Sequence, residues 1–134
     1  MVKIAVQSYR DLLVWQKSVE LAIGCYRAIK SFPASELYGL TSQIQRAAVS
    51  VAANIAEGHG RKSLGEYLHQ LSIARGSLME LETHLIIAAR LSYLRSPKTL
   101  LEDTAEVGRM LNGLIAHLKK RVAGSPLQLL TPDT

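Results

Sequence analysis

The chain has little cysteine and few aromatic residues. Its one cysteine, Cys25, excludes an intramolecular disulfide and fits a reducing compartment. Aromatic residues make up only 5% of the sequence, while Leu, Ala and Ile are abundant. Because strands prefer aromatic and β-branched residues, this composition favours helices.

Long apolar runs are also missing. The longest covers residues 47–56, and Ser50 and Asn54 interrupt it, whereas a membrane-spanning helix needs about 18 apolar residues. The first eight residues lack the apolar stretch of about 7–15 residues that a signal peptide needs. We therefore expect a cytoplasmic protein that does not enter a membrane.

What remains is the composition of one globular domain. Hydrophobic residues make up 48% and charged residues 20% of 134 residues, which is typical of a folded domain with a core. We expect this domain to cover residues 1–124. Residues 125–134 contain two prolines and hardly any charge, so we expect a loose tail there.

Apolar residues recur at steps of three and four in four segments, which is the spacing of one helix face. The segments cover residues 12–31, about 35–57, 63–88 and 96–124. The expected core stripes are, in chain order, Leu12, Trp15, Val19, Ala22, Tyr26 and Ile29; Leu37, Leu40, Ile44, Ala47, Val51 and Asn54; Tyr67, Leu71, Ala74, Leu78, Leu81, Leu85 and Ala88; and Leu100, Thr104, Val107, Leu111, Leu114 and Leu118.

Capping residues and helix breakers bound the first two segments. Asp11 is the expected N-cap of the first segment, and Pro33 closes it because proline cannot continue a helix. Gly58 and Gly60 are expected to end the second segment, since glycine accepts the left-handed conformation of a helix cap.

The last two segments begin with clear signals. Ser63 followed by Glu66 is a capping-box pattern, and Ser96-Pro97 places a cap before a proline at the first helical position. Four helices joined by short turns predict an all-α fold, an antiparallel up-down-up-down four-helix bundle.

The second segment is apolar on all sides, whereas a helix of a lone four-helix bundle normally keeps one polar face toward water. We therefore predict that its outer face contacts another subunit and that the protein is a homo-oligomer. The alternative is that alanine is simply a good helix former that tolerates exposure. The residues concerned are Ala47, Ala48, Val49, Val51, Ala52, Ala53, Ile55 and Ala56.

Patterns for catalysis, cofactors and metals are weak. A di-iron bundle needs two Glu-x-x-His pairs, and only Glu66 with His69 matches, while His84 and His117 lack the glutamate. Glu66 is better explained by capping, and Cys25 by burial as a small core residue. No strand and no GK[ST] motif accompany the glycines. We predict no enzyme, no cofactor and no metal site.

Four polar residues lie on or beside the expected core stripes: Asn54, Glu57, Arg75 and Glu80. Buried polar groups must be paired, so we expect these side chains to form one hydrogen-bonded network. Polar residues on such seams commonly fix register and oligomeric state, which makes the subunit contact a candidate location.

Basic residues exceed acidic ones, giving a net charge of +5. In an up-down bundle the turn after the second helix and the end of the fourth share one end, so their basic residues would form a rim there. This rim, together with Arg46 on the flank of the second helix, is the candidate binding site for RNA or DNA phosphates. The alternative is that these basic residues only keep the protein soluble and balance the helix dipoles. The rim residues are Arg61, Lys62, Lys119, Lys120 and Arg121.

Several motifs in order resemble the 23S rRNA intervening-sequence protein family, also called the four-helix bundle protein family. The resemblance covers roughly residues 9–95 and departs at Ala52-Ala53, where a proline is expected. The motifs are YRDL at 9–12, VW at 14–15, FP at 32–33, YGLT at 38–41, RAAVSV at 46–51, NIAEG at 54–58, IARGS at 73–77 and ELET at 80–83.

The resemblance implies a bacterial cytoplasmic protein that forms a ring-shaped homo-oligomer, a pentamer by family pattern. Some family members are encoded inside insertions in the large ribosomal RNA gene, and a related branch comprises retroelement accessory variability proteins. Two hypotheses follow: a non-enzymatic oligomer that binds RNA or DNA phosphates, or a protein-interaction adaptor that presents its ring to a partner enzyme.

Overall fold

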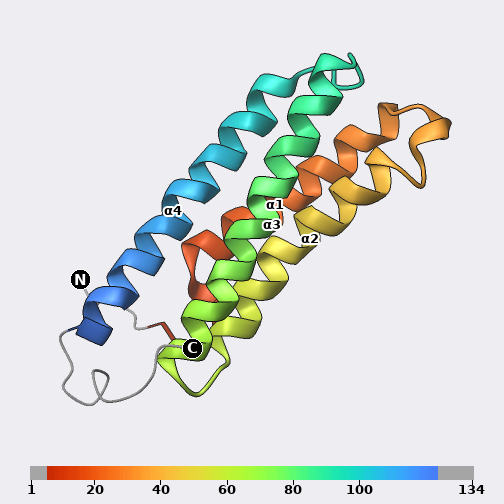
Figure 1. Cartoon of the computed structure of the whole chain (residues 1–134). Helices are drawn as coiled ribbons and strands as arrows, with labels where there is room; N and C mark the ends of the chain where they lie inside the picture. Colours follow the sequence, from red (N-terminus) through yellow and green to blue (C-terminus); the bar gives the residue numbers. More distant parts are fainter. Residues whose placement is uncertain (1–5, 124–134) are drawn as a thin grey trace.

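The computed structural model describes residues 6–123, which form an all-α fold of four long helices. Helices α1 (Leu13–Ala28), α2 (Leu40–His59), α3 (Leu64–Arg90) and α4 (Pro97–Ala123) alternate in direction along the bundle, as Figure 1 shows. The predicted up-down-up-down arrangement is confirmed. The expected tail at residues 125–134 and the domain boundary at 124 lie outside the described residues.

Each helix packs against two others, so that the four stand at the corners of a square. Contacts join α1 to α2, α2 to α3, α3 to α4 and α4 back to α1. Short 3₁₀ helices η1 (Tyr9–Asp11), η2 (Ile29–Ser31) and η3 (Ala34–Glu36) occupy the connections around α1 and before α2. The fully buried large side chains come from all of the longer helices.

The core stripe predicted for α3 matches the structure. Its residues from Leu71 to Ala88 at steps of three and four are buried, and Tyr67 is half-buried. On α4 the predicted stripe is also buried except Leu114, which is half-buried beside the buried Ile115. On both helices the core-facing residues follow the predicted steps of three and four, although α3 also exposes Ile73, Met79, Ile86 and Ile87 on its other faces.

The stripe predicted for α1 is largely wrong, because only its last residue, Ile29, is buried. The buried line is Val14, Ser18, Leu21 and Cys25, continuing into η2 at Ile29. The predicted residues Leu12, Trp15, Val19 and Ala22 are only partly buried, and Tyr26 is 43% exposed. Helix α1 has two apolar stripes side by side, and the predicted one faces α2 and the outside rather than the bundle axis.

Helix α2 begins five residues later than predicted, at Leu40 rather than 35. Residues 34–36 form η3, and Gly39 adopts a non-helical conformation (φ −109°, ψ −113°) that separates it from α2. The Glu36 carboxylate accepts a hydrogen bond from the Leu40 amide at 3.2 Å and satisfies the first turn. Leu37, predicted in the core, is therefore 54% exposed.

The predicted cap of α1 is wrong, and the predicted cap of α2 is right in position at Gly60 but not in its left-handed conformation. The α1 N-cap is Leu12, which makes no side-chain cap bond, because Asp11 belongs to η1. The Asp11 carboxylate accepts from the backbone amides of Gln7 and Ser8. Gly58 lies inside α2, and Gly60 caps it with φ −81°, which is not left-handed.

The predicted start signals of the last two helices are confirmed, except for one half of the capping box. Ser63 is the N-cap of α3, and its hydroxyl accepts from the Glu66 amide at 3.1 Å. The hydrogen bonds of the described residues include this half of the capping box but not the reverse bond from the Ser63 amide. Helix α4 begins at Pro97, as the Ser96-Pro97 pair predicted.

Candidate functional site

The basic residues of the predicted rim lie at one end of the bundle. Arg61 and Lys62 stand in the turn between α2 and α3, and three more basic residues occupy the last turns of α4. Figure 1 shows the end of α4 and the α2–α3 turn at the same lower end of the molecule. All five side chains are exposed: Arg61, Lys62, Lys119, Lys120 and Arg121.

The rim follows from how the helices end. Leu118 is the last buried residue in the described part of α4, and the three basic residues after it turn outward. Gly60 ends α2, so the chain leaves the core before Arg61 and Lys62. The cations at the end of α4 also interact favourably with the negative end of its helix dipole.

One rim residue is already paired. Arg61 donates to the carboxylate of Glu57, one helical turn earlier. Among residues 6–123 the other ion pair joins Lys17 to Glu106 at 3.4 Å, on α1 and α4. The ion pairs within the described part of the chain do not include the other four rim residues.

Arg46 lies apart from the rim. It sits in the second turn of α2, and 15 residues separate it from Arg61, a rise of roughly 22 Å if helical throughout. Its guanidinium donates to the side-chain oxygen of Gln43, and its neighbours across a shallow pocket are Ser50, Ser77 and Glu80. The structure therefore does not bring Arg46 together with the rim.

The four residues of the predicted polar network have separate partners within one chain. Asn54 donates to the carbonyl and the hydroxyl of Ser50, and Arg75 donates to Asn112 at 3.4 Å. Glu57 pairs with Arg61, and Glu80 is exposed. No hydrogen bond among residues 6–123 links the four to one another, so they do not form one network inside the chain.

A pair of serines that the sequence pattern did not reveal bridges α2 and α3. The hydroxyls of Ser50 and Ser77 lie 2.8 Å apart, and Asn54 bonds the same Ser50 hydroxyl. Serine is common on helix surfaces, so the sequence spacing of these two residues did not distinguish them from other serines.

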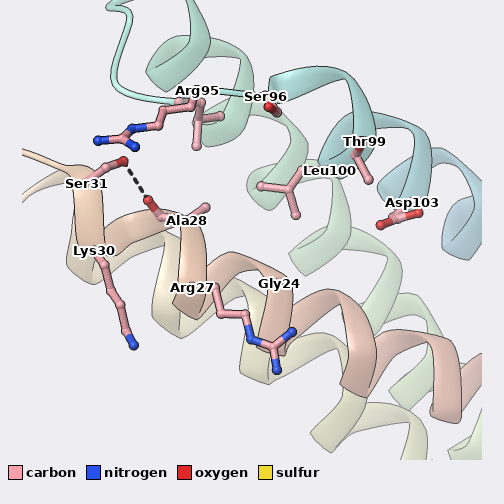
Figure 2. A pocket seen from close by; sticks show the side chains of 11 residues that line it. Gly24, Arg27, Ala28, Lys30, Ser31, Arg95, Ser96, Thr99, Leu100 and Asp103 are labelled. Carbon is pink, nitrogen blue, oxygen red and sulfur yellow. Dashed lines mark hydrogen bonds between the residues drawn. The ribbon is translucent and has the colours of Figure 1, made fainter.

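A cavity of about 610 Å³ between α1 and α4 holds a second basic cluster that the sequence pattern did not reveal. Arg27, Lys30 and Arg95 line it together with Asp103. Figure 2 shows the three cationic groups pointing in different directions, while the Ser31 hydroxyl bonds the carbonyl of Ala28. The cluster lies at the opposite end from the rim and does not converge on one point.

An apolar groove of about 660 Å³ runs between α1 and α2. Its walls are the second stripe of α1 and the outer face of α2, which the sequence marked as apolar. Arg27 and Lys30 stand on its border. The apolar lining residues are Val19, Ala22, Ile23, Tyr26, Val49, Ala52 and Ala53.

Two observations on residues 6–123 concern groups that catalysis could use. Cys25 is fully buried, and burial raises the pKa of its thiol to about 12, which suppresses the reactive thiolate. Residues 6–123 contain no group of three or more His, Cys, Asp or Glu side chains placed to hold a metal ion. Among the same residues, no helix combines the length and the apolar character needed to cross a membrane.

Comparisons with known proteins identify relatives by family and by structure. The family model described as 23S rRNA-intervening sequence protein matches residues 10–113. A crystal structure of a protein with unknown function from the S23 ribosomal protein family of Bacteroides thetaiotaomicron is similar, with a TM-score of 0.70 and 27% identity. That similarity covers 77% of this chain and 98% of the other. No curated protein sequence matches significantly. On the family match, which spans most of its length, this chain belongs to the 23S rRNA-intervening sequence protein family.

Proposed function

We propose that this protein is a non-enzymatic homo-oligomer in the bacterial cytoplasm that binds RNA or DNA phosphates through its basic rim. The observation that carries the proposal is the gathering of five exposed basic side chains at one end of the bundle. The family pattern favours a ring, with five subunits as the expected number. In such a ring the rim repeats around the axis and multiplies the number of phosphate contacts.

The chemistry of the rim favours the phosphate backbone over the bases. Lysine and arginine neutralise phosphates and release their counterions, so affinity falls steeply with salt. No aromatic residue is interleaved with the basic residues inside either rim segment, 61–62 or 119–121, and stacking of bases needs such side chains. Binding should therefore depend weakly on nucleotide sequence.

Charge reversal at the rim tests the proposal. Replacing Lys62 and Lys120 with glutamate should weaken binding of a structured RNA and of a duplex DNA by at least about tenfold at low salt. The dependence of log affinity on log salt should flatten by about one for each phosphate that the variant no longer neutralises. Both the affinity and its salt dependence come from fluorescence anisotropy titrations at two salt concentrations.

The matched control reverses two charges at the opposite end of the bundle. Arg90 at the end of α3 and Lys98 at the start of α4 are exposed, and replacing both with glutamate changes the net charge by the same amount. This control should keep most of the wild-type affinity. Equal losses of affinity in both double variants would show that net charge, rather than the rim, governs binding.

The alternative function, an adaptor that presents the oligomer to a partner enzyme, gives the opposite result. It predicts no binding of either nucleic acid at low salt and binding to a protein that salt does not weaken. The exposed apolar groove between α1 and α2 is the surface that favours this alternative.

A further inference from the structure

The cavity between α1 and α4 has an apolar floor. Its less exposed lining residues are Gly24 and Ala28 on α1, Leu94 in the α3–α4 turn and Leu100 on α4. A Cβ atom on Gly24 would lie 3.2 Å from the Cδ2 atom of Leu100, so glycine leaves room that a larger residue would fill. The floor therefore offers a ligand an aliphatic surface without hydrogen-bonding side chains.

Contacts behind the cavity hold its two walls together at the turn end. The Ser31 hydroxyl donates to the Tyr93 carbonyl at 3.1 Å, and the Tyr93 hydroxyl donates to the Glu36 carboxylate at 3.2 Å. The rings of Phe32 and Tyr93 also pack, with centroids 5.5 Å apart. These contacts join the end of α1 to the α3–α4 turn, so the cavity is preformed. Its volume of about 610 Å³ lies in the range of sites that bind small molecules.

Exposed charged residues surround the apolar floor. Arg27, Lys30 and Arg95 carry three positive charges and Asp103 carries one negative charge, so these four residues give the lining a net charge of +2. The ion pairs within the described residues include none of the four. A phosphate monoester carries a charge of about −1.5 to −2 at pH 7, which matches this lining.

The charged residues are spread along the cavity. Figure 2 shows Arg95 near Ser31 at one end and Asp103 at the other, with Thr99 and Leu100 between them. Because the cationic groups do not converge on one point, the lining is not arranged around a compact ion. It suits an elongated molecule that has an anionic group at one end and a hydrogen-bond donor at the other.

Each part of this lining favours a particular chemical group. The Arg95 guanidinium matches a phosphate, which it can bind through two parallel hydrogen bonds. The Asp103 carboxylate only accepts hydrogen bonds, so it favours a donor such as the amino group of a nucleobase. The aliphatic floor between them favours a flat, weakly polar body. A mononucleotide combines these three groups in this order.

We propose that the α1–α4 cavity binds a mononucleotide, with its phosphate at Arg95 and the amino group of its base at Asp103. The site lies at the opposite end of the bundle from the basic rim. It therefore goes beyond the proposed binding of RNA or DNA and does not depend on it.

Calorimetric titrations of the full chain with guanosine and uridine 5′-monophosphates test the site. The guanosine compound should bind saturably at one site per chain, and Arg95→Ala should weaken it at least about tenfold, because the phosphate loses charge-assisted hydrogen bonds. The uridine compound has no amino group on its base and should bind about tenfold more weakly. Asp103→Ala should remove this preference between the two nucleotides.

Lys98→Ala is the matched control, since Lys98 is an exposed basic residue in the first turn of α4 and does not line the cavity. It should keep the wild-type affinity, and circular dichroism checks that every variant keeps its helices. An equal loss in Lys98→Ala and Arg95→Ala would overturn the site. The absence of saturable binding to the wild type would overturn it as well.

Methyl NMR spectra of the wild type locate the nucleotide without any substitution. The methyl signals of Leu94 and Leu100 should shift when guanosine 5′-monophosphate is added, because both residues line the cavity. Those of Leu118, which is buried near the rim, should stay in place. Shifts at Leu118 alone would place the nucleotide at the rim and contradict the proposal.

Discussion

Replacing Gly58 with alanine should destabilise the bundle, although alanine is the better helix former. Gly58 is buried in the last turn of α2, where α3 passes close by. A Cβ atom there would lie 2.9 Å from the Gln70 Cβ and 3.0 Å from a ring carbon of Tyr67. Its third neighbour is the backbone oxygen of Tyr67 at 3.3 Å, so α2 and α3 must separate. We expect a loss of about 1–3 kcal/mol in the free energy of unfolding.

Gly113→Ala is the control for this prediction. Gly113 is an exposed α4 residue, and nothing lies within 4 Å of the position that its Cβ would take. The same substitution should stabilise the protein there by up to about 1 kcal/mol, because alanine favours helix. Urea unfolding of both variants at one protein concentration measures the two changes. A stabilised Gly58→Ala variant would contradict the close packing of α2 on α3.

Iodoacetamide should react with Cys25 of the native protein at least about 1000-fold more slowly at pH 8 than with the unfolded chain. Burial raises the pKa of this thiol from 9.0 to about 12, so the thiolate fraction at pH 8 falls about 1000-fold. The thiol is also fully covered by the core, which further slows the reaction. Mass spectrometry of timed samples, with and without urea, measures both rates.

The same thiol gives the protein a pH dependence with a definite sign. A group whose pKa is raised by folding stabilises the native state below its unfolded pKa and loses that contribution as pH rises through the folded value. The Cys25 contribution should therefore be complete below pH 9 and decline toward pH 12. Cys25→Ala should remove this part of the decline. If iodoacetamide labelled the native protein at pH 8 as fast as the unfolded chain, the result would contradict the buried position of Cys25.

The fold was predictable because two helices each have a regular core-facing stripe. The steps from Leu71 to Ala88 on α3, and from Leu100 to Leu118 on α4, continue along the whole helix, and the structure buries almost all of these residues. The start signals Ser63 and Ser96-Pro97 located the beginnings of both helices, because caps depend on local hydrogen bonds alone.

Helix α1 was not predictable in the same way, since it carries two adjacent apolar stripes. Sequence periodicity shows that Trp15, Val19, Ala22 and Tyr26 share a face, but it does not show whether that face meets the bundle axis or the outside. The polar Ser18 in the true core line favoured the wrong choice; its hydroxyl is satisfied locally by the Val14 carbonyl at 2.7 Å.

For the candidate site, helix order alone placed the rim residues at one end. It could not show that Glu57 pairs with Arg61 or that Arg46 lies far from both, because side-chain pairing depends on exact rotation and rotamers. The expected polar network is missing inside the chain for the same reason. Asn54 bonds Ser50 one turn earlier on its own helix instead of a partner on α3.

The mass of the native protein in solution tests the central claim, a ring of identical subunits, most directly. The chain mass is 14.7 kDa, and multi-angle light scattering at micromolar concentration should give a single species of several times that value, with five as the expected multiple. A species of 14.7 kDa at every concentration tested would contradict the ring and, with it, the repeated rim.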